Sequence, residues 1–126
     1  MKRMWIGVGL LAAVLISGIW VAGQMREIHQ EMAKDLNRAA ACVLDEDWDM
    51  ATALAARAEK DWSKKRPLTA SFADHEPLED IDALFAQLAV YSRLRDKAAY
   101  SSICADLASQ LEALGESHRF TFWNLL

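Results

Sequence analysis

The chain has 126 residues, of which 14 are Lys or Arg and 18 are Asp or Glu, so its formal net charge at pH 7 is −4. This length allows one modest hydrophobic core and not two domains. Residues 24–126 hold 12 of the basic residues and all 18 acidic ones, a net charge of about −6. Nucleic-acid binding requires a basic face for the phosphates, so we expect no nucleic-acid partner.

Residues 4–23 contain no charged side chain and are flanked by charged residues on both sides. A helix of about 20 residues, at 1.5 Å per residue, matches the roughly 30 Å hydrocarbon core of a bilayer. Trp5 and Trp20 lie about 22 Å apart along such a helix, a spacing typical of aromatic rings at the two headgroup levels. The sequence therefore predicts a transmembrane anchor with Trp5 and Trp20 near its ends.

A cleaved signal peptide is the alternative, because it shares the basic start and the apolar middle. Secretory apolar regions run about 7–15 residues, and Trp20 stands where a processing site requires small residues. An uncleaved signal anchor is therefore favoured. Since the first charges to meet the insertion machinery usually dominate, we expect residues 1–3 in the cytoplasm, residues 4–23 in the cell membrane and residues 24–126 as an extracytoplasmic domain.

Three small residues, Gly9, Ala13 and Ser17, recur every four positions within the predicted span. They would share one helix face, on which a second membrane helix could pack closely. Gly and Ala are also common in spans that pack against nothing. The face is thus a candidate for packing within the membrane, against a partner or a second copy.

Glycine is nearly absent from the predicted domain, where only Gly115 occurs. Phosphate-binding loops and dinucleotide fingerprints require several glycines, so nucleotide sites of those kinds are excluded. Alternation typical of strands is missing as well. Apolar residues instead recur at spacings of three and four, the period of a helix face. The four predicted buried faces are Met25, Ile28, Met32, Leu36, Ala39 and Val43; Trp48, Ala51, Leu54, Ala55, Ala58 and Trp62; Leu78, Ile81, Leu84, Leu88 and Tyr91 with Phe85; and Tyr100, Ile103, Leu107, Leu111 and Leu114.

Capping residues and prolines predict where these helices begin and end. We expect the anchor to continue without a break to about Leu44, with a bend at Gln24 as the alternative. A second helix would end before Pro67, which cannot continue it. The third would begin at Asp74 or His75, with Pro77 tolerated in its first turn.

The fourth helix would be capped by Asp96 and closed by Gly115 in a left-handed conformation. Short connections favour antiparallel packing of neighbouring helices. The predicted fold is therefore all-α, an N-terminal transmembrane helix continuing into an antiparallel bundle of about four helices.

The acidic residues Asp45, Asp47 and Asp49 alternate as in a calcium-binding EF-hand loop. The sixth position of that loop must be Gly and the twelfth a bidentate Glu, whereas Met50 and Ala56 stand there. Acidic side chains also suit the positive end of a helix dipole. Helix capping therefore explains these residues better than calcium.

The remaining reactive residues do not form a catalytic or metal-ligating motif. His29, His75 and His118 lack metal-ligand spacing, and no nucleophile elbow accompanies the cluster Asp74, His75 and Glu76, so a hydrolase using that cluster is only an alternative. Cys42 and Cys104 are the only cysteines. They could be bridged, but burial as free thiols is favoured. We predict no catalytic residue, cofactor or metal.

The end of the chain, residues 120–126, is strongly apolar after a polar link over residues 116–119. Chain ends usually fray unless something covers them. The tail would dock on the bundle itself or, alternatively, form a partner surface. The residues of that possible partner surface are Phe120, Phe122, Trp123, Leu125 and Leu126.

Several short motifs resemble a bacterial domain-of-unknown-function family, number 4363 in that series, of small single-pass, all-helical membrane proteins. The resemblance covers nearly the whole chain and implies fold and membrane placement better than activity. No reaction is assigned to that family, and some members are encoded beside polytopic membrane proteins, which implies a membrane-protein partner. The motifs are Asp47-Trp48, Trp62, Phe72, Asp74-His75-Glu76, the Leu88 to Tyr91 region and Thr121-Phe122-Trp123-Asn124-Leu125-Leu126.

These observations favour binding over catalysis. We expect an accessory or interaction subunit, not an enzyme, in contact with the lipid bilayer and with an integral membrane protein. A homo-oligomeric structural protein is the first alternative, and a hydrolase is the second. A pocket with convergent polar side chains would favour the enzyme, and an exposed apolar surface would favour the binder.

Overall fold

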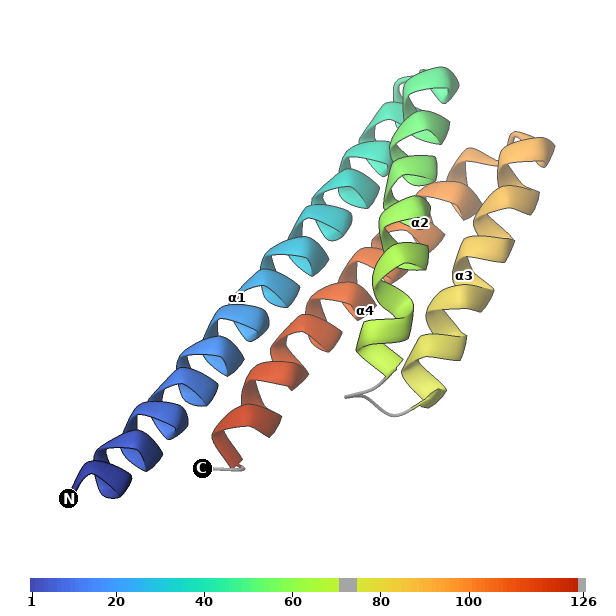
Figure 1. Cartoon of the computed structure of the whole chain (residues 1–126). Helices are drawn as coiled ribbons and strands as arrows, with labels where there is room; N and C mark the ends of the chain where they lie inside the picture. The colour runs from blue at the N-terminus through green and yellow to red at the C-terminus, as the bar shows by residue number, and fades with distance from the viewer. Residues whose placement is uncertain (71–74, 125–126) are drawn as a thin grey trace.

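In a computed structural model, the described residues form four helices (Figure 1). The structure describes residues 1–70 and 75–124, with the side chains of all of these except residues 22, 25, 68, 75 and 117–124. The helices are α1 (Lys2–Leu44), α2 (Trp48–Ala70), α3 (His75–Leu94) and α4 (Lys97–Asn124). No strand occurs in the two described ranges. The prediction of an all-α fold with four helices that pack together is confirmed.

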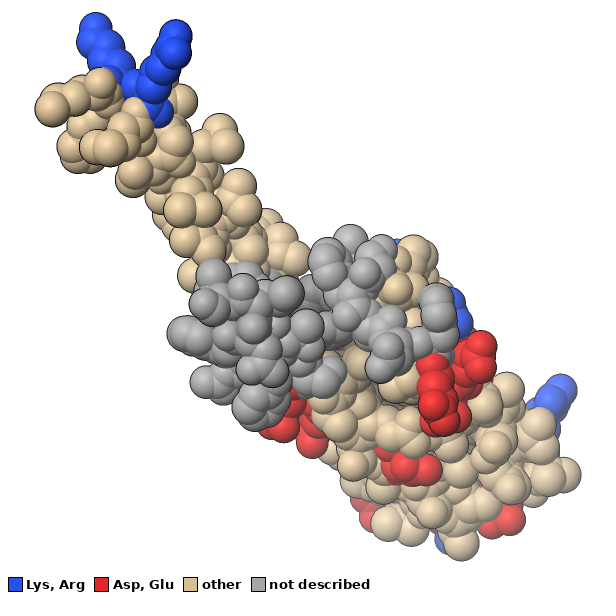
Figure 2. All heavy atoms as spheres, turned by 90° about the horizontal axis from the view of Figure 1, so that it is seen from below, with Lys and Arg blue, Asp and Glu red and all other residues tan. Residues whose placement is uncertain are grey.

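Helix α1 is continuous over 43 residues, from Lys2 to Leu44. At 1.5 Å per residue its length is about 64 Å. Its first half is exposed and projects from the rest of the molecule as a rod (Figure 2), whereas its second half contributes one face to the core. The predicted continuity past Gln24 is therefore confirmed.

The two described connections are short and capped by aspartates. Asp47 Oδ1 accepts a hydrogen bond from Met50 N at 3.1 Å, and Asp96 Oδ1 accepts one from Ala99 N at 3.1 Å. Each aspartate thus satisfies one of the free N–H groups at the start of its helix. The preceding residues Glu46 and Arg95 adopt positive φ, 65° and 55°. Both residues adopt the left-handed conformation that glycine usually occupies, at a modest cost in backbone energy.

The second helix does not end at Pro67, as the sequence predicted, but continues to Ala70. Proline removes one backbone hydrogen bond, and this matters least when only a last turn follows it. The Thr69 hydroxyl donates to the Lys65 carbonyl at 2.9 Å, and Thr69 is fully buried. This buried turn extends α2 beyond the proline.

The fourth helix does not end at Gly115 either, and no described glycine has a positive φ. Gly115 lies inside α4, where its missing side chain leaves room for α1. A contact between helices therefore explains this glycine, and the predicted left-handed closure is wrong.

The predicted buried faces meet in one core, which lies between the second half of α1 and the other three helices. Of the predicted residues, Ile28, Trp48, Tyr91 and Ile103 are half-buried, and the side chain of Met25 lies outside those described. The prediction of four apolar faces is confirmed for the rest. It missed His29 and Thr69, which are the two buried polar residues among the described side chains.

Ion pairs join α1, or the turn that follows it, to α2 and α4. Arg57 of α2 makes a bidentate ion pair with Asp35 of α1, Nε to Oδ2 at 2.9 Å and Nη2 to Oδ1 at 2.5 Å. Lys97, at the start of α4, pairs with Glu46 just after α1. Since α4 then reaches the His29 region through Gly115, it runs back along α1 toward the exposed half of that helix (Figure 1).

Candidate functional site

The exposed half of α1 is the most unusual surface of the molecule. Trp5 and Trp20 are 71% and 66% exposed, and the large apolar residues between them are exposed to a similar degree, except Leu15, which is half-buried. A soluble protein rarely leaves so much contiguous apolar area uncovered. Among the described residues, α1 is the one helix long and apolar enough to cross a membrane, and none of its most apolar window is buried in the bundle. A helix of this composition in a bundle core would be buried, so these residues do not serve the bundle's own core.

Charge is distributed unevenly between the rod and the bundle. The two basic residues Lys2 and Arg3 lie at the tip of the rod, beyond its uncharged stretch, and acidic side chains dot the visible face of the bundle (Figure 2). Basic residues next to an apolar span are typical of membrane segments. The rod thus has a basic tip, residues 2–3, followed by an uncharged part, residues 4–23, which we call the shaft. The bundle beyond the shaft is acidic.

The small-residue face lies on the exposed shaft. Gly9, Ala13 and Ser17 are all exposed, and a side chain added at Gly9 would have no neighbour within 4 Å. The Ser17 hydroxyl donates to the Ala13 carbonyl at 2.7 Å, so its hydrogen bond is made within the helix. Such a bond allows a serine to sit in an apolar environment. The face is therefore free for an approaching helix.

The predicted partner surface at the chain end falls largely outside the described part. Helix α4 continues to Asn124, so the backbone of Phe120, Phe122 and Trp123 extends α4 and is not a separate tail after a link. Their side chains, and residues 125–126, lie outside the described residues. Their role as a surface stays a prediction.

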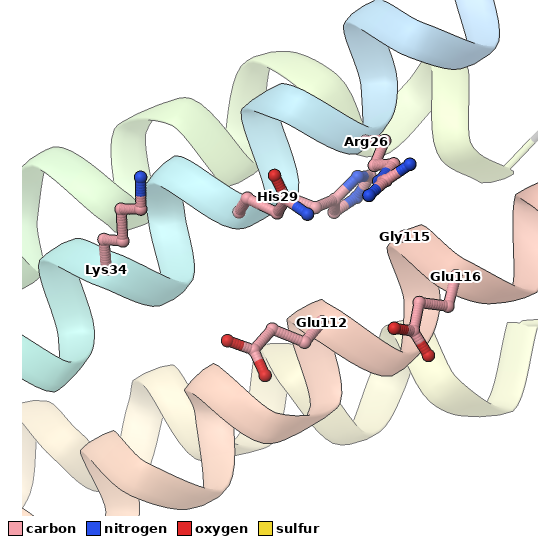
Figure 3. Close-up of a pocket in the computed structure, with 7 residues that line it drawn as sticks. Arg26, His29, Lys34, Glu112, Gly115 and Glu116 are labelled. Atoms are coloured by element: carbon pink, nitrogen blue, oxygen red, sulfur yellow. The ribbon is translucent and has the colours of Figure 1, made fainter.

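A cleft lies between α1 and α4, just beyond the uncharged shaft (Figure 3). Its volume is about 340 Å³. One wall is basic and comes from α1, and the other is acidic and comes from α4. The lining residues are Arg26, His29, Gln30 and Lys34 of α1 and Glu112, Gly115 and Glu116 of α4.

The close approach of the two helices determines the position of this cleft. A methyl group on Gly115 would lie 3.3 Å from His29 Cβ and 4.0 Å from Arg26 Cα. His29 is 1% exposed. The helices therefore touch along the line from Gly115 to His29, and the longer side chains beside that line border the open space. The sequence predicted neither the burial of His29 nor the cleft.

The far end of the bundle carries an aromatic cluster around Trp48. Its ring lies 5.2 Å from that of Tyr100, edge to face, and the Arg95 guanidinium lies 5.0 Å from the Trp48 ring centre. Burial raises the pKa of the Tyr100 hydroxyl above its usual range. These contacts pack the aromatic rings together at the end of the core, so the cluster serves stability.

The reactive side chains do not converge. Cys42 and Cys104 are free, and burial raises the pKa of the Cys104 thiol to about 12, which keeps it protonated and unreactive. No group of three His, Cys, Asp or Glu residues in the described ranges is placed to hold a metal ion. Asp74 and the side chain of His75 lie outside those ranges, and Glu76 is exposed.

The chain was compared with known proteins. Residues 19–125 match the family described as Domain of unknown function (DUF4363). The chain belongs to this family. The match confirms the resemblance seen in the sequence, and it covers the end of the shaft and nearly all of the bundle. Comparisons with curated proteins and with solved structures found no significant match.

The family assignment brings no active-site residues with it, because the domain is one of unknown function. Function must therefore be inferred from the shaft and the cleft themselves. Of the two, the shaft was visible in the sequence as an uncharged run. The cleft was not, since its walls are 78 or more positions apart in the chain, from Lys34 to Glu112.

Proposed function

We propose that this DUF4363 chain is a single-pass membrane protein that acts by binding another integral membrane protein. The observation that carries the proposal is the exposed apolar shaft of α1, which the described part of the bundle leaves uncovered. In water such a surface would be costly, at about 25 cal/mol per Å² of apolar area. In a bilayer it is the surface that the lipid requires.

The orientation follows from the charges. Lys2 and Arg3 remain in the cytoplasm, residues 4–23 cross the cell membrane as an uncleaved anchor, and the acidic bundle lies outside the cytoplasm. Because α1 has no break between its apolar half and its core-forming half, the position of the span in the membrane also determines the position of the bundle. The bundle is thus held close to the membrane surface.

Partner binding is proposed to use the face made of Gly9, Ala13 and Ser17. Helices associate in lipid mainly by close packing, for which small residues are favourable. Ser17 satisfies its own hydroxyl, so an apolar helix can lie against it without leaving a polar group unpaired. A second copy of the chain could use the same face, which makes a homo-oligomer the alternative.

The test is recovery of partners from native membranes in mild detergent. Ala13→Leu adds bulk to the small face, and Leu11→Phe adds bulk on the opposite face, because two residues rotate the helix by about 200°. We expect Ala13→Leu to lose co-purifying membrane proteins and Leu11→Phe to retain them. If both variants recovered the same proteins as the parent, the face would not be the binding site. Recovery of further copies of this chain alone would establish the homo-oligomer instead.

A further inference from the structure

The position of the cleft relative to the proposed span suggests what it binds. Arg26 follows the last residue of the span, Gly23, by three positions, about 4.5 Å along the helix. The headgroup layer extends roughly 5–8 Å beyond the hydrocarbon core on each side. The Arg26 end of the cleft is therefore at the level of the lipid headgroups, while Lys34 lies about 12 Å farther from the membrane. This step depends on the membrane placement proposed above.

The cleft carries charges of both signs that do not pair with each other. Among the described residues, no ion pair joins Arg26 or Lys34 on α1 to Glu112 or Glu116 on α4. Elsewhere in this bundle opposite charges on neighbouring helices do pair, as Arg57 does with Asp35 and Arg66 with Asp82. The walls of this cleft are held apart, with a volume of about 340 Å³ between them.

Each wall repeats one charge along a single helix face. Glu112 and Glu116 are four positions apart, a spacing at which like charges repel within a helix. Arg26 and Lys34 are eight positions apart on one face, with Gln30 between them. A ligand that carries an anionic and a cationic group would offset the repulsion between the two glutamates and could pair with the basic wall at the same time. Charged hydrogen bonds of this kind are the stronger ones in proteins.

We propose that this cleft binds the headgroup of a phosphatidylethanolamine lipid, with its phosphate against Arg26 and its ammonium against Glu112. In such a lipid the phosphate lies nearer the hydrocarbon and the ammonium farther out. In the cleft Gly115 lies beside Arg26 and α4 runs back along α1, so Glu112 lies about 4.5 Å farther from the membrane than Gly115. Glu116 lies one residue to the membrane side of Gly115, so Glu112 is the glutamate in the ammonium position. The cleft volume of about 340 Å³ is at the lower end of the roughly 300–1,000 Å³ range of ligand sites, which suits one small headgroup.

The acidic wall makes the site selective. A phosphatidylglycerol headgroup has the phosphate but no cation, so its binding would leave the glutamates facing a net negative ligand. Gln30 can donate to a phosphate oxygen or accept from an ammonium, because an amide carries both kinds of group. The chemistry of the walls therefore favours the zwitterion over the anionic lipid.

The test is native mass spectrometry of the full chain released from nanodiscs that contain equal amounts of phosphatidylethanolamine and phosphatidylglycerol. We expect retained phosphatidylethanolamine to exceed phosphatidylglycerol. Glu112→Gln and Arg26→Gln should each reduce its retention about tenfold, which corresponds to roughly 1.4 kcal/mol for one lost charged hydrogen bond. The matched controls Asp106→Asn on α4 and Arg38→Gln on α1 alter exposed charges outside the cleft and should change nothing.

The possible results separate the two proposals. A chain that does not insert into the nanodisc contradicts the membrane anchor itself. An inserted chain that retains both lipids equally, or prefers phosphatidylglycerol, contradicts the headgroup site alone. So does a melting temperature that falls in Glu112→Gln while lipid retention stays unchanged, because the charges would then serve only the contact between the helices. Displacement of the lipid by equimolar soluble glycerophosphoethanolamine would overturn a membrane source for the ligand.

Discussion

Gly115 of α4 lies so close to His29 of α1 that a methyl group added to the glycine would be 3.3 Å from His29 Cβ. Glycine inside a helix costs about 0.5–1 kcal/mol relative to alanine, so a structural reason is expected where one is kept. Here the reason is the contact that fixes α4 against α1 at the base of the bundle. The sequence alone suggested the end of a helix at this position.

Substitutions at Gly115 should separate the low helix propensity of glycine from its close contact with His29. Gly115→Ala gains helix propensity and loses some packing, so the free energy of unfolding should change by less than about 1 kcal/mol. Gly115→Leu forces the helices apart and should destabilise the fold by about 1–3 kcal/mol. Thermal melting of the full chain in detergent measures both. A Gly115→Leu variant as stable as the parent would show that the contact is not close.

Trp62 is predicted to contribute through burial and through one hydrogen bond. It is 2% exposed, and its Nε1 donates to Asp82 Oδ1 at 2.7 Å, while Arg66 Nε donates to Asp82 Oδ2 at 2.8 Å. Trp62→Ala should cost about 3–5 kcal/mol in the free energy of unfolding. Trp62→Phe keeps most of the apolar contact and should cost clearly less. Chemical denaturation checks the order, and equal losses in the two variants would contradict it.

Alkaline pH should weaken the bundle. Burial raises the pKa of the Cys104 thiol from 9.0 to about 12 and raises that of Tyr100 as well, so the folded state favours the protonated forms. The contribution of these two groups to the free energy of unfolding is fully present below about pH 9. As the pH rises toward 12, each group should lower the free energy of unfolding by at most about 1.4 kcal/mol per pH unit. Denaturation measured from about pH 7 to pH 11 tests the sign.

The matched variants for this pH effect remove the titrating groups. Cys104→Ala and Tyr100→Phe should each flatten the alkaline slope, although Cys104→Ala lowers stability at neutral pH by leaving a small cavity. The hydrogen bond from Tyr100 Oη to the Ala51 carbonyl is long, 3.4 Å, so its loss should cost little. An unchanged slope in both variants would contradict the assignment of the pH effect to Cys104 and Tyr100.

Membrane retention is the next prediction. The apolar shaft exceeds the length of a secretory signal, so the chain should remain in the membrane pellet after alkaline carbonate extraction, with its mass intact. Mass spectrometry of the pellet provides the measurement. Soluble chains that begin near Gln24 would establish a cleaved signal peptide.

The sequence predicted the core well because its signal is local. Met32 and Leu36 on α1, like Leu107 and Leu111 on α4, recur at helical spacing, and all four are fully buried. The aspartate cap at Asp96 was equally visible, since a cap acts on the three residues that follow it.

The errors have one physical origin, the contacts between distant segments. Pro67 and Gly115 are local stop signals, but tertiary packing carries each helix past them. The cleft could not be predicted because Arg26 and Glu112 are brought together only by the return of α4 along α1. His29 gave no signal beyond its position two turns before Leu36 on the apolar face of α1.

The central claim, that the shaft binds another membrane protein through its small-residue face, is tested most directly by photo-crosslinking in native membranes. A photoreactive amino acid is placed at Ala13, on that face, or at Leu11, on the opposite face. We predict an adduct with a different membrane protein from Ala13 and lipid adducts alone from Leu11. Lipid adducts alone from both positions, or adducts between two copies of this chain, would contradict the claim.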